Sequence, residues 1–513
     1  MLAKVQSFIL IGIDPLQCEI EVDVSQRGLQ RTIIVGLAQT AVKESIERVH
    51  RAIINSGYAF PGHALLINLA PADVKKEGTA FDLPIAIGLL ASSELIPHEP
   101  LAEHLFLGEL SLHGEVKPVR GALSIALMAK KKKIKKLILP EKNAREASVI
   151  PEVRVLGVRH LADVVGHITG ERPLEPQGPA QARSIQSPIT LQHAPDFSEI
   201  KGQTQAKRAL EVAAAGGHNV IMVGPPGSGK TMLAQRIATI LPPMHFEESL
   251  ETSKIYSVVG RLNGSENLIT ARPFRSPHHT ISTAGLAGGG SHPRPGEVSL
   301  AHNGVLFLDE LPEFQKNVLE ILRQPLESGI VTIARALMTT TYPARFMLIA
   351  AMNPCRCGFR GSRIKECVCT PVELRVYRNR ISGPLLDRID LQIEVPPVSF
   401  TELTAAKEGE TSDKVRTRVL AARELQKKRF TGTRLHANAQ MSGRLLRNHT
   451  LIDADGARLL EQAVTKLSLS ARAYDRILKV ARTIADLAGI PQIGTQHLAE
   501  AIHYRSLDRN YGM

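Results

Sequence analysis

The sequence is poor in the residues that build base-stacking surfaces and membrane spans. It has no tryptophan, and aromatic residues make up only 4% of its 513 residues. Because single-stranded nucleic acids stack their bases on aromatic side chains, this scarcity argues against an extended stacking platform. No apolar run approaches the ~20 residues that a transmembrane helix needs. The first apolar stretch is broken at Asp14, too early for a signal peptide. We therefore expect a cytoplasmic protein without a membrane span.

Cysteine is also scarce, and it is unevenly placed. Four of the five cysteines form two C-x-C pairs in one short segment. This arrangement does not resemble a secreted disulfide framework, so metal binding is the favoured use. Four thiolates are a ligand set for tetrahedral Zn²⁺, although C-x-x-C is the usual spacing. The predicted zinc ligands are Cys355, Cys357, Cys367 and Cys369, with four reduced thiols or occasional disulfides as the alternative.

Charge and patterning divide the chain into regions. The net charge of +13 favours a polyanionic partner such as nucleic acid, with a merely solvated surface as the alternative. Residues 1–170 alternate β-rich and helical stretches, and residues 171–196 form a proline-rich linker. Residues 197–396 have the pattern of an α/β layer with a parallel sheet. Residues 397–513 show the apolar spacing of amphipathic helices, which predicts an all-α lid.

A glycine-rich segment predicts a phosphate-binding loop. The apolar run NVIMV leads into G-x-x-x-x-G-K-T, and the amphipathic stretch LAQRIATIL follows. In this motif backbone N–H groups close on the phosphates, and the positive end of the helix dipole assists them. Lys230 is expected to reach the β and γ phosphates of ATP, and Thr231 to hold Mg²⁺. The predicted loop comprises Gly224, Pro225, Pro226, Gly227, Ser228, Gly229, Lys230 and Thr231.

Two further apolar runs end in polar residues that suit ATP hydrolysis. The run GVLFL is followed by Asp309 and Glu310, and the run LIAAM is followed by Asn353. As buried strands, these runs would present the polar residues at their C-terminal ends. Asp309 is expected to bind Mg²⁺ through water, and Glu310 to act as the general base. Asn353 can orient the attacking water against the γ phosphate.

The motifs GPPGSGKT, FLDE, AAMNP and SGPLLDRIDL, in this order, resemble an AAA+ module of the magnesium-chelatase and MCM-helicase branch. The resemblance implies that Arg388 is an arginine finger for the neighbouring subunit's ATP, with Arg380 as the rival candidate. It also implies that Arg472 is the lid arginine, which touches the γ phosphate. A finger supplied to a neighbour makes hydrolysis depend on assembly, so we expect a homohexameric ring. For each arginine, the alternative is a surface salt bridge.

Two segments of the predicted ATPase core are candidates for contacting the partner. Residues 271–304 are rich in Arg, His and Gly, and in this branch an insertion here faces the pore. Residues 329–351 resemble an MCM hairpin that precedes the strand equivalent to the one ending at Asn353 here. The MCM pattern has a basic residue where this chain has Arg335. Basic side chains on such loops can grip phosphates without reading bases. The candidates are Arg272, Arg275 and Arg335, and for the first two the alternative is a subunit contact.

The first region contains stretches, residues 68–90 and 106–147, that resemble the proteolytic domain of Lon. The resemblance implies a small α/β sandwich of the ribosomal S5 domain 2-like type. Lon uses a serine activated by a lysine, and the matching positions here are Ala80 and Leu123. We therefore expect this fold without peptidase chemistry, and a role in binding or assembly.

Together, the Lon-like region, the AAA+ module with its C-x-C pairs and the helical region resemble the ComM family, also called YifB-like or magnesium-chelatase-like proteins. The resemblance implies a hexameric, ATP-driven DNA helicase that promotes branch migration and extends recombination of incoming DNA in naturally competent bacteria. Its implied partners are single-stranded and branched DNA, and other recombination proteins. The alternatives are a magnesium-chelatase motor subunit, an ATP-dependent protein unfoldase and an ATP-gated scaffold without motor activity.

Overall fold

The computed structural model describes two compact units. The first comprises residues 1–187 and 245–270, and the second comprises residues 188–244 and 271–513. Within them, the structure describes residues 2–25, 31–38, 40–62, 64–76, 78–178, 195–262, 267–290, 293–335, 338–361, 365–399, 402, 409–433, 435–467, 469–505 and 507. Among these residues, no helix combines the length and the apolar character that crossing a bilayer requires.

The first unit is built on a 7-stranded mixed sheet in the order β3-β4-β2-β1-β5-β8-β9. Its two long strands pair antiparallel, and the strands from β1 to β9 run parallel. Buried and more exposed residues alternate along β1, as expected when one face of a sheet covers a core. The strands are β1 (Leu2–Ile11), β2 (Asp14–Ser25), β3 (Thr32–Val35), β4 (Ala64–Ala70), β5 (His104–Phe106), β8 (Lys136–Pro140) and β9 (Arg154–Val158).

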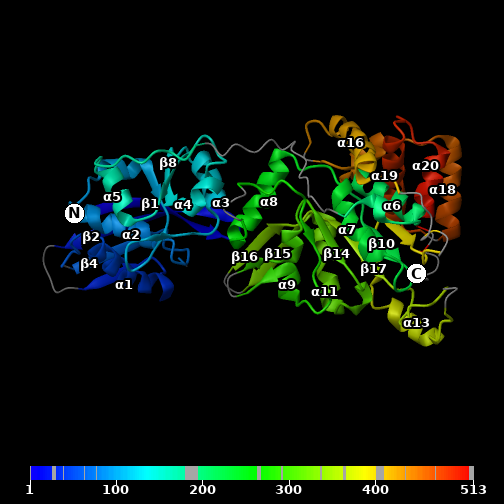
Figure 1. Ribbon diagram of the computed structural model, residues 1–513, viewed down its shortest axis with the longest axis horizontal. Helices are drawn as coiled ribbons and strands as arrows, with labels where there is room; N and C mark the ends of the chain where they lie inside the picture. Colours follow the sequence, from blue (N-terminus) through cyan, green and yellow to red (C-terminus); the bar gives the residue numbers. More distant parts are fainter. Residues whose placement is uncertain are drawn as a thin grey trace. The chain divides into compact units, whose positions relative to one another are not determined.

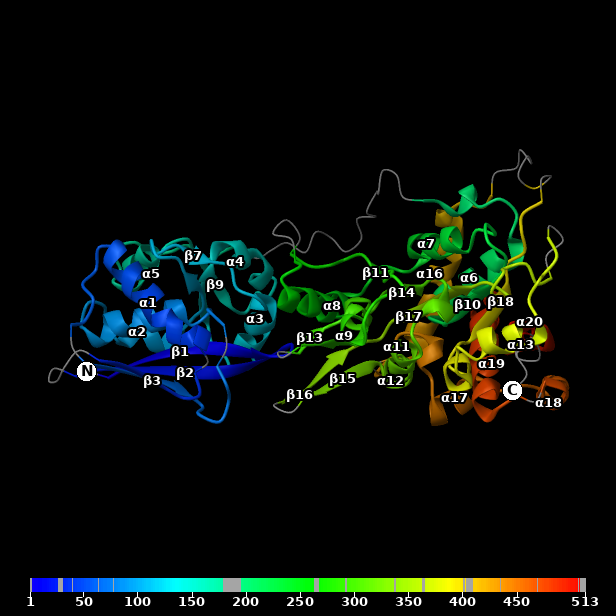
Figure 2. The same cartoon turned by 90° about the horizontal axis from the view of Figure 1, so that it is seen from below.

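Helices complete the core of this unit. Figure 2 shows α1 and α2 on the same side of the long strands β1 and β2. A helix from the range predicted as ATPase core, α8, also belongs to this unit and packs on α3. Near α8, Leu268 is buried in the same apolar cluster as Leu123 of α3. The helices are α1 (Thr40–Asn55), α2 (Asp82–Ser92), α3 (Ala122–Lys131), α4 (Glu141–Ala147), α5 (Leu161–Ile168) and α8 (Phe246–Val259).

The second unit contains a parallel sheet of five strands in the order β11-β14-β17-β10-β18. All residues of β10, β14 and β17 are buried, which explains why these strands read as continuous apolar runs. Figure 1 shows α6 (Thr204–Gly216) and α7 (Lys230–Ile240) beside this sheet. The strands are β10 (Val220–Val223), β11 (Phe274–Arg275), β14 (Val305–Leu308), β17 (Met347–Met352) and β18 (Leu391–Glu394).

Shorter elements connect the strands of this sheet. An antiparallel hairpin, β15 (Ile330–Arg335) and β16 (Met338–Pro343), precedes β17. The connecting helices are α9 (Thr283–Ala287), α10 (Glu297–Leu300), α11 (Lys316–Ile321), α12 (Arg323–Ser328), α13 (Pro371–Arg378) and α14 (Gly383–Leu386).

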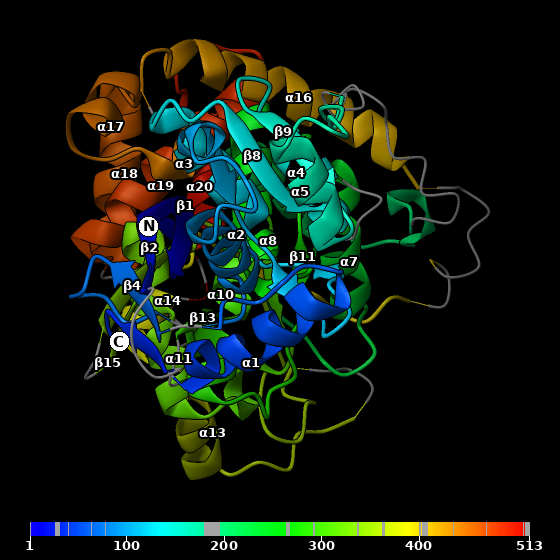
Figure 3. The ribbon, with the colours of Figure 1, turned by 90° about the vertical axis from the view of Figure 1, so that its left-hand side faces the viewer.

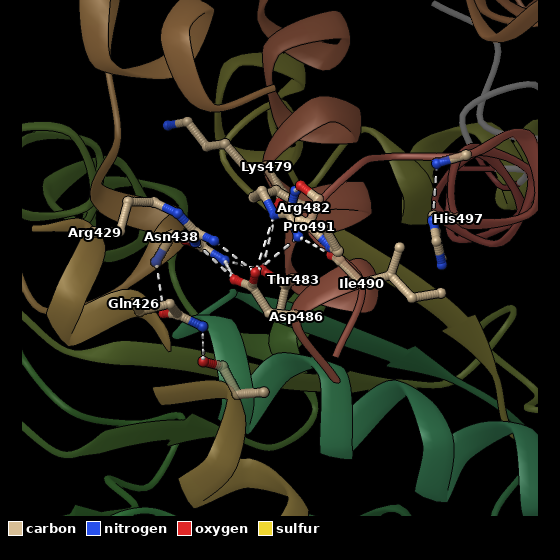
Figure 4. A network of polar contacts seen from close by, with 12 residues as sticks. Gln426, Arg429, Asn438, Lys479, Arg482, Thr483, Asp486, Ile490, Pro491 and His497 are labelled. Carbon is tan, nitrogen blue, oxygen red and sulfur yellow. Dashed lines mark hydrogen bonds and ion pairs between the residues drawn. The ribbon is translucent and has the colours of Figure 1, made fainter. Parts of the chain in front are cut away.

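The C-terminal region is helical and shares one apolar core with the parallel sheet. Inside it, the buried carboxylate of Asp486 accepts hydrogen bonds from Arg429, Arg482 and Asn438 (Figure 4). The helices are α16 (Ser412–Arg429), α17 (Gly443–His449), α18 (Ala454–Leu467), α19 (Ala471–Leu487) and α20 (Thr495–His503). The prediction of a mixed α/β protein with a parallel sheet and a helical C-terminal region is confirmed.

A second buried carboxylate, Asp390, ties the helical region to the sheet. It precedes β18, pairs with Arg476 of α19 and accepts a hydrogen bond from the backbone of Asn219 at 2.8 Å. The His218 ring lies 3.7 Å from the same carboxylate and is fully buried. Burial opposes ionisation of Asp390, but the charge of Arg476 and the hydrogen bonds from His218 and Asn219 together outweigh it, so the pKa of this carboxyl lies well below its usual range. The Asp390–Arg476 pair is therefore ionised at neutral pH.

Replacing Asp390 with Asn should destabilise the protein, because Arg476 loses its buried partner. Removing one member of a buried pair typically costs about 3–5 kcal/mol in the free energy of unfolding. Thermal and urea unfolding at pH 7.5 measure this change. The matched control is Asp455→Asn, an i,i+3 pair whose carboxylate is 73% exposed, where a change below about 0.5 kcal/mol is expected.

The pH dependence of the same variant has a defined sign. A depressed carboxyl pKa adds stability above the unfolded value of about 3.9, and this stability is lost as the pH falls through the folded value. The difference between wild type and Asp390→Asn should therefore narrow below about pH 4. A constant difference down to pH 3 would contradict the ionised pair.

Candidate nucleotide site and the residues around it

The polar residues predicted for ATP hydrolysis meet at one edge of the parallel sheet. Val223, the last residue of β10, pairs with Met352, the last residue of β17. The phosphate loop follows the first of these strands and Asn353 the second. Leu308, the last residue of β14, pairs with Ala350, so Asp309 emerges at the same edge. The carboxyl ends of parallel strands are where ligands bind in open α/β sheets.

Each of three glycines in the phosphate loop has its own structural reason. Gly227 and Gly229 adopt φ of 75° and 88°, a left-handed conformation that other residues rarely take. A Cβ on Gly224 would lie 2.2 Å from the carbonyl oxygen of Val395, so a side chain is excluded there by space. The Oγ of Ser228 is buried and has no hydrogen-bond partner among the described residues. An unpartnered polar atom in this loop suits a phosphate ligand.

Lys230 begins α7 and turns its ammonium back over the loop. Nζ donates to the carbonyl oxygens of Gly224 at 2.8 Å and Pro225 at 2.9 Å, and to Oδ1 of Asn353 at 3.3 Å. The residue is 8% exposed. Burial lowers the pKa of this ammonium, while the charges of Asp309 and Glu310 oppose that shift. Its bonds to neutral carbonyls leave the positive charge available for phosphate.

The predicted magnesium ligands are already in contact. Thr231 Oγ1 donates to Oδ2 of Asp309 at 2.7 Å, so the hydroxyl and the carboxylate lie where one hydrated cation can meet both. Glu310 follows with a φ of 51°, which ends the strand and turns its carboxylate outward to 57% exposure. The residues thus fit ATP with Mg²⁺, which would supply charge neutralisation at the β and γ phosphates.

Sequence reasoning missed a histidine beside the predicted general base. His279 Nδ1 lies 3.5 Å from Oε2 of Glu310, and its ring faces those of His278 and Phe314. His279 belongs to the segment 271–304, whose arginines were the predicted functional residues. The adjacent pair of histidines was the available signal, but only the fold brings it to Glu310. The contact gives this segment a direct connection to the hydrolytic carboxylate.

Three matches to magnesium-chelatase family models cover most of the chain. The model of magnesium chelatase, subunit ChlI, matches residues 196–403, that of subunit ChlI of Mg-chelatase residues 20–143, and that of the ChlI C-terminal region residues 409–505. The chain is 45% identical over 511 residues to the uncharacterized protein YifB of Salmonella typhimurium, covering 99% of this chain and 98% of that protein. It is 44% identical over 510 residues to the competence protein ComM of Haemophilus influenzae, with the same coverage.

The chain belongs to the ComM/YifB family. A magnesium-chelatase 38 kDa subunit of Rhodobacter capsulatus is 24% identical over 328 residues, which are 59% of this chain and 84% of that subunit. Membership in a magnesium-chelatase-like family implies an AAA+ core that uses ATP and Mg²⁺.

In this ComM/YifB family member, Arg388 lies near the amino ends of the parallel strands, whereas its own phosphate loop lies at their carboxyl ends. It comes before β18, whose first residue, Leu391, pairs with Val220 at the start of β10. Its carbonyl oxygen accepts a hydrogen bond from the side chain of Asn219 at 3.1 Å, just before β10. Lys230 follows the other end of that strand. Arg388 is therefore separated from the phosphate site of its own protomer by the length of strand β10.

A glutamate that sequence reasoning also missed holds Arg388 together with Arg472. Glu327 of α12 pairs with Arg388 and lies 3.9 Å from Arg472. The hydrogen bond from Arg388, followed by its charge, lowers the pKa of the Glu327 carboxyl. Arg472 is 58% exposed, whereas the rival finger Arg380 bonds to Glu313 and to the carbonyl of Pro312. The two predicted arginines thus share one carboxylate at one edge of the sheet.

The three candidate DNA contacts differ in their surroundings. Arg272 donates to the carbonyl oxygens of Pro242 and Asn303, which fixes the ends of its segment. Arg275 forms a bidentate pair with Glu297 at 2.6 and 2.8 Å. Arg335 is exposed at the end of β15 and lines a hollow of about 430 Å³ together with Arg323. Of the three, Arg335 has the surroundings that best suit an external ligand.

The four clustered cysteines come together directly after β17. Cys355 lies 3.4 Å from Cys357 and 3.7 Å from Cys367, measured between sulfurs, and the four Sγ atoms all lie within 4.8 Å of one another. All four are free thiols. A hydrogen bond from the backbone of Phe359 lowers the pKa of the Cys357 thiol to about 6. This cluster can hold a metal ion.

The positions matched to the Lon dyad carry no catalytic chemistry. Leu123 is fully buried in the apolar core of the first unit, and Ala80 packs against the same cluster. Neither methyl nor isobutyl groups can act as nucleophile or base.

Proposed function

We propose that this protein is a ring-forming AAA+ ATPase that drives movement along single-stranded and branched DNA. As a homohexameric helicase it would promote branch migration when incoming DNA recombines. The observation that supports a ring is that Arg388 and Lys230 of the same protomer lie beyond opposite ends of β10. An arginine on the far edge of the sheet can complete an ATP site only in a neighbouring copy. Hydrolysis in each site then depends on assembly.

Each residue of the site has a proposed part in hydrolysis. Lys230 and the amides of the phosphate loop would bind the β and γ phosphates, and Thr231 with Asp309 would hold the hydrated Mg²⁺. Glu310 would accept the proton of the attacking water, and Asn353 would orient that water. Arg388 would contact the γ phosphate in the neighbouring subunit. Arg472 would be the lid arginine that touches a γ phosphate, and it contacts the same Glu327 as Arg388.

DNA is the proposed substrate for three reasons. The chain carries a net charge of +13, a relative along its full length is named a competence protein, and Arg335 is exposed at the end of a hairpin strand that leads toward Asn353. The scarcity of aromatic residues favours phosphate contacts over base stacking. Two accessory features complete the proposal. Residues 1–170 would form a catalytically inactive Lon-like domain, and the cysteine cluster would hold Zn²⁺.

The experiment is to measure ATP hydrolysis with and without single-stranded and branched DNA, and then strand displacement. We expect DNA to raise the ATPase rate and a labelled strand to be released only with hydrolysable ATP. The similarity to a chelatase subunit makes a magnesium-chelatase motor subunit one alternative function, and a protein unfoldase is the other. No stimulation by DNA and no displacement, with ATP-dependent unfolding of a tagged protein instead, would replace the DNA proposal.

Arg335→Ala should weaken DNA binding equally for all sequences, because the proposed contact is to phosphate. For each phosphate of a single strand that the protein no longer neutralises, the slope of log affinity against log salt should fall by about 0.7. Fluorescence anisotropy with a labelled oligonucleotide at several salt concentrations measures both quantities. Arg458→Ala, which removes a side chain 72% exposed on α18, is the matched control. An unchanged salt slope in Arg335→Ala would remove this residue from the DNA contacts.

A further inference from the structure

We propose that the four-cysteine loop is a metal-held support for the phosphate loop. Zn²⁺ bound by Cys355, Cys357, Cys367 and Cys369 would fix the backbone at Gly358 against Pro226. ATP binding would then depend on a metal that touches neither the nucleotide nor its magnesium. The inference rests on the proposed ATPase function and assigns the cluster a regulatory task within it.

The sulfur positions match a tetrahedral site. A Zn–S bond of about 2.3 Å places neighbouring sulfurs of a regular tetrahedron about 3.8 Å apart. Three sulfur separations in the cluster are 3.4, 3.7 and 3.6 Å. A disulfide would need about 2.05 Å, so the cluster is not cross-linked. Four thiols at this spacing repel one another once ionised, and a divalent cation removes that repulsion.

Burial gives the described residues of this loop little support. Within its described residues, 355–361 and 365–369, only Cys355 and Gly358 are buried. A segment without an apolar core has to be fixed by other means, and small metal-binding loops take their folding free energy from the ion. The buried Cys355 comes two residues after Asn353, so the metal would also fix the end of β17.

Gly358 makes the contact with the nucleotide site. A Cβ on this residue would lie 2.7 Å from Cδ and 2.8 Å from Cγ of Pro226, and 4.0 Å from Cγ of Asn353. The backbone of the cysteine loop therefore rests on the phosphate loop and beside the residue that accepts the hydrogen bond of Lys230. Its φ of 85° is set within the turn between the two C-x-C pairs. Removal of the metal would release this turn and its support of Pro226.

The test uses the full-length protein, purified without chelators, and two readouts that do not need turnover. One is zinc content by mass spectrometry, and the other is the affinity for a fluorescent ATP analogue with Mg²⁺. The double variant Cys367→Ser/Cys369→Ser should lose the zinc and bind the analogue about tenfold or more weakly. Cys18→Ser is the matched control, because Cys18 is a buried cysteine of the other unit. It should retain both zinc and affinity.

A second variant keeps all four thiols and alters the turn at Gly358, both by its contact with Pro226 and by placing a side chain at a φ of 85°. Gly358→Ala should keep about one zinc per chain, yet weaken analogue binding about tenfold, because the added methyl overpacks against Pro226. Thermal unfolding of each variant verifies that the sheet core remains folded.

Absence of zinc from the wild type would overturn the metal site. Zinc in the wild type with unchanged affinity in both variants would overturn the support role and leave the ATPase proposal intact. A failure of the DNA proposal would appear elsewhere, as absent strand displacement with zinc-dependent ATP binding retained.

Discussion

Glu310→Gln should lower the rate of ATP hydrolysis by about 10²–10⁴-fold while ATP still binds. A general base contributes that much to proton transfer, and an amide of the same shape cannot accept the proton from water. The contacts that bind nucleotide, from Lys230 and from the Thr231–Asp309 pair, are left in place. Phosphate release under saturating ATP measures the rate, and a fluorescent analogue measures binding.

Glu313→Gln is the matched control for this change. Glu313 lies three residues further on, is 44% exposed and pairs with Arg380. Its hydrolysis rate should stay within about twofold of wild type, as expected for an exposed ion pair. If Glu310→Gln also hydrolysed ATP at such a rate, the base would have to be sought elsewhere, with His279, whose Nδ1 lies 3.5 Å from Oε2 of Glu310, as the first candidate.

Arg388→Ala should abolish hydrolysis in the pure variant, by about 10³–10⁵-fold, and retain nucleotide binding. An arginine finger contributes this factor by stabilising charge on the transferring phosphoryl group. Since Arg388 lies at the sheet edge away from its own phosphate loop, its removal should affect the neighbour's site. Mixing therefore provides a sharper measurement than the single variant.

Neither Arg388→Ala nor Lys230→Ala should hydrolyse ATP alone, but a mixture of the two should regain part of the activity. In a mixed ring, some interfaces join an intact phosphate loop to an intact Arg388. Recovery would also verify that both variants are folded, which matters because Arg388 is only 7% exposed and pairs with Glu327. No recovery on mixing, or full activity in a strict monomer, would contradict the shared site. Arg380→Ala, the rival finger, should keep substantial activity.

The sequence was most informative where chemistry and fold are encoded in neighbouring residues. The phosphate loop and the carboxylate strand are contiguous motifs between apolar strands, and the parallel sheet brings Lys230, Asp309 and Asn353 together at its carboxyl edge. The mixed α/β class and the helical C-terminal region followed from apolar periodicity, which is a local property. The roles of these residues stay predictions until they are measured.

The features that the sequence could not predict depend on contacts between distant residues. His279 and Glu310 are separated in the chain by three strands and two helices, and no periodicity links them. Glu327 reads as an ordinary surface acid of a helix until the fold places two arginines beside it. Arg272 and Arg275 are both basic residues of one polar segment, but one binds backbone carbonyls and the other a carboxylate. Only the tertiary structure distinguishes them.

The membership of α8 in the first unit has a practical meaning for anyone who divides this protein into fragments. The chain passes between the units at residues 187–188, 244–245 and 270–271, so no single cut separates them. A fragment that stops in the proline-rich stretch would lack α8 and leave the side of α3 that it covers in water, including part of the cluster around Leu268. The reciprocal fragment would carry that helix with nothing to pack on. Intact halves would require excision of residues 245–270 from one piece and their return to the other.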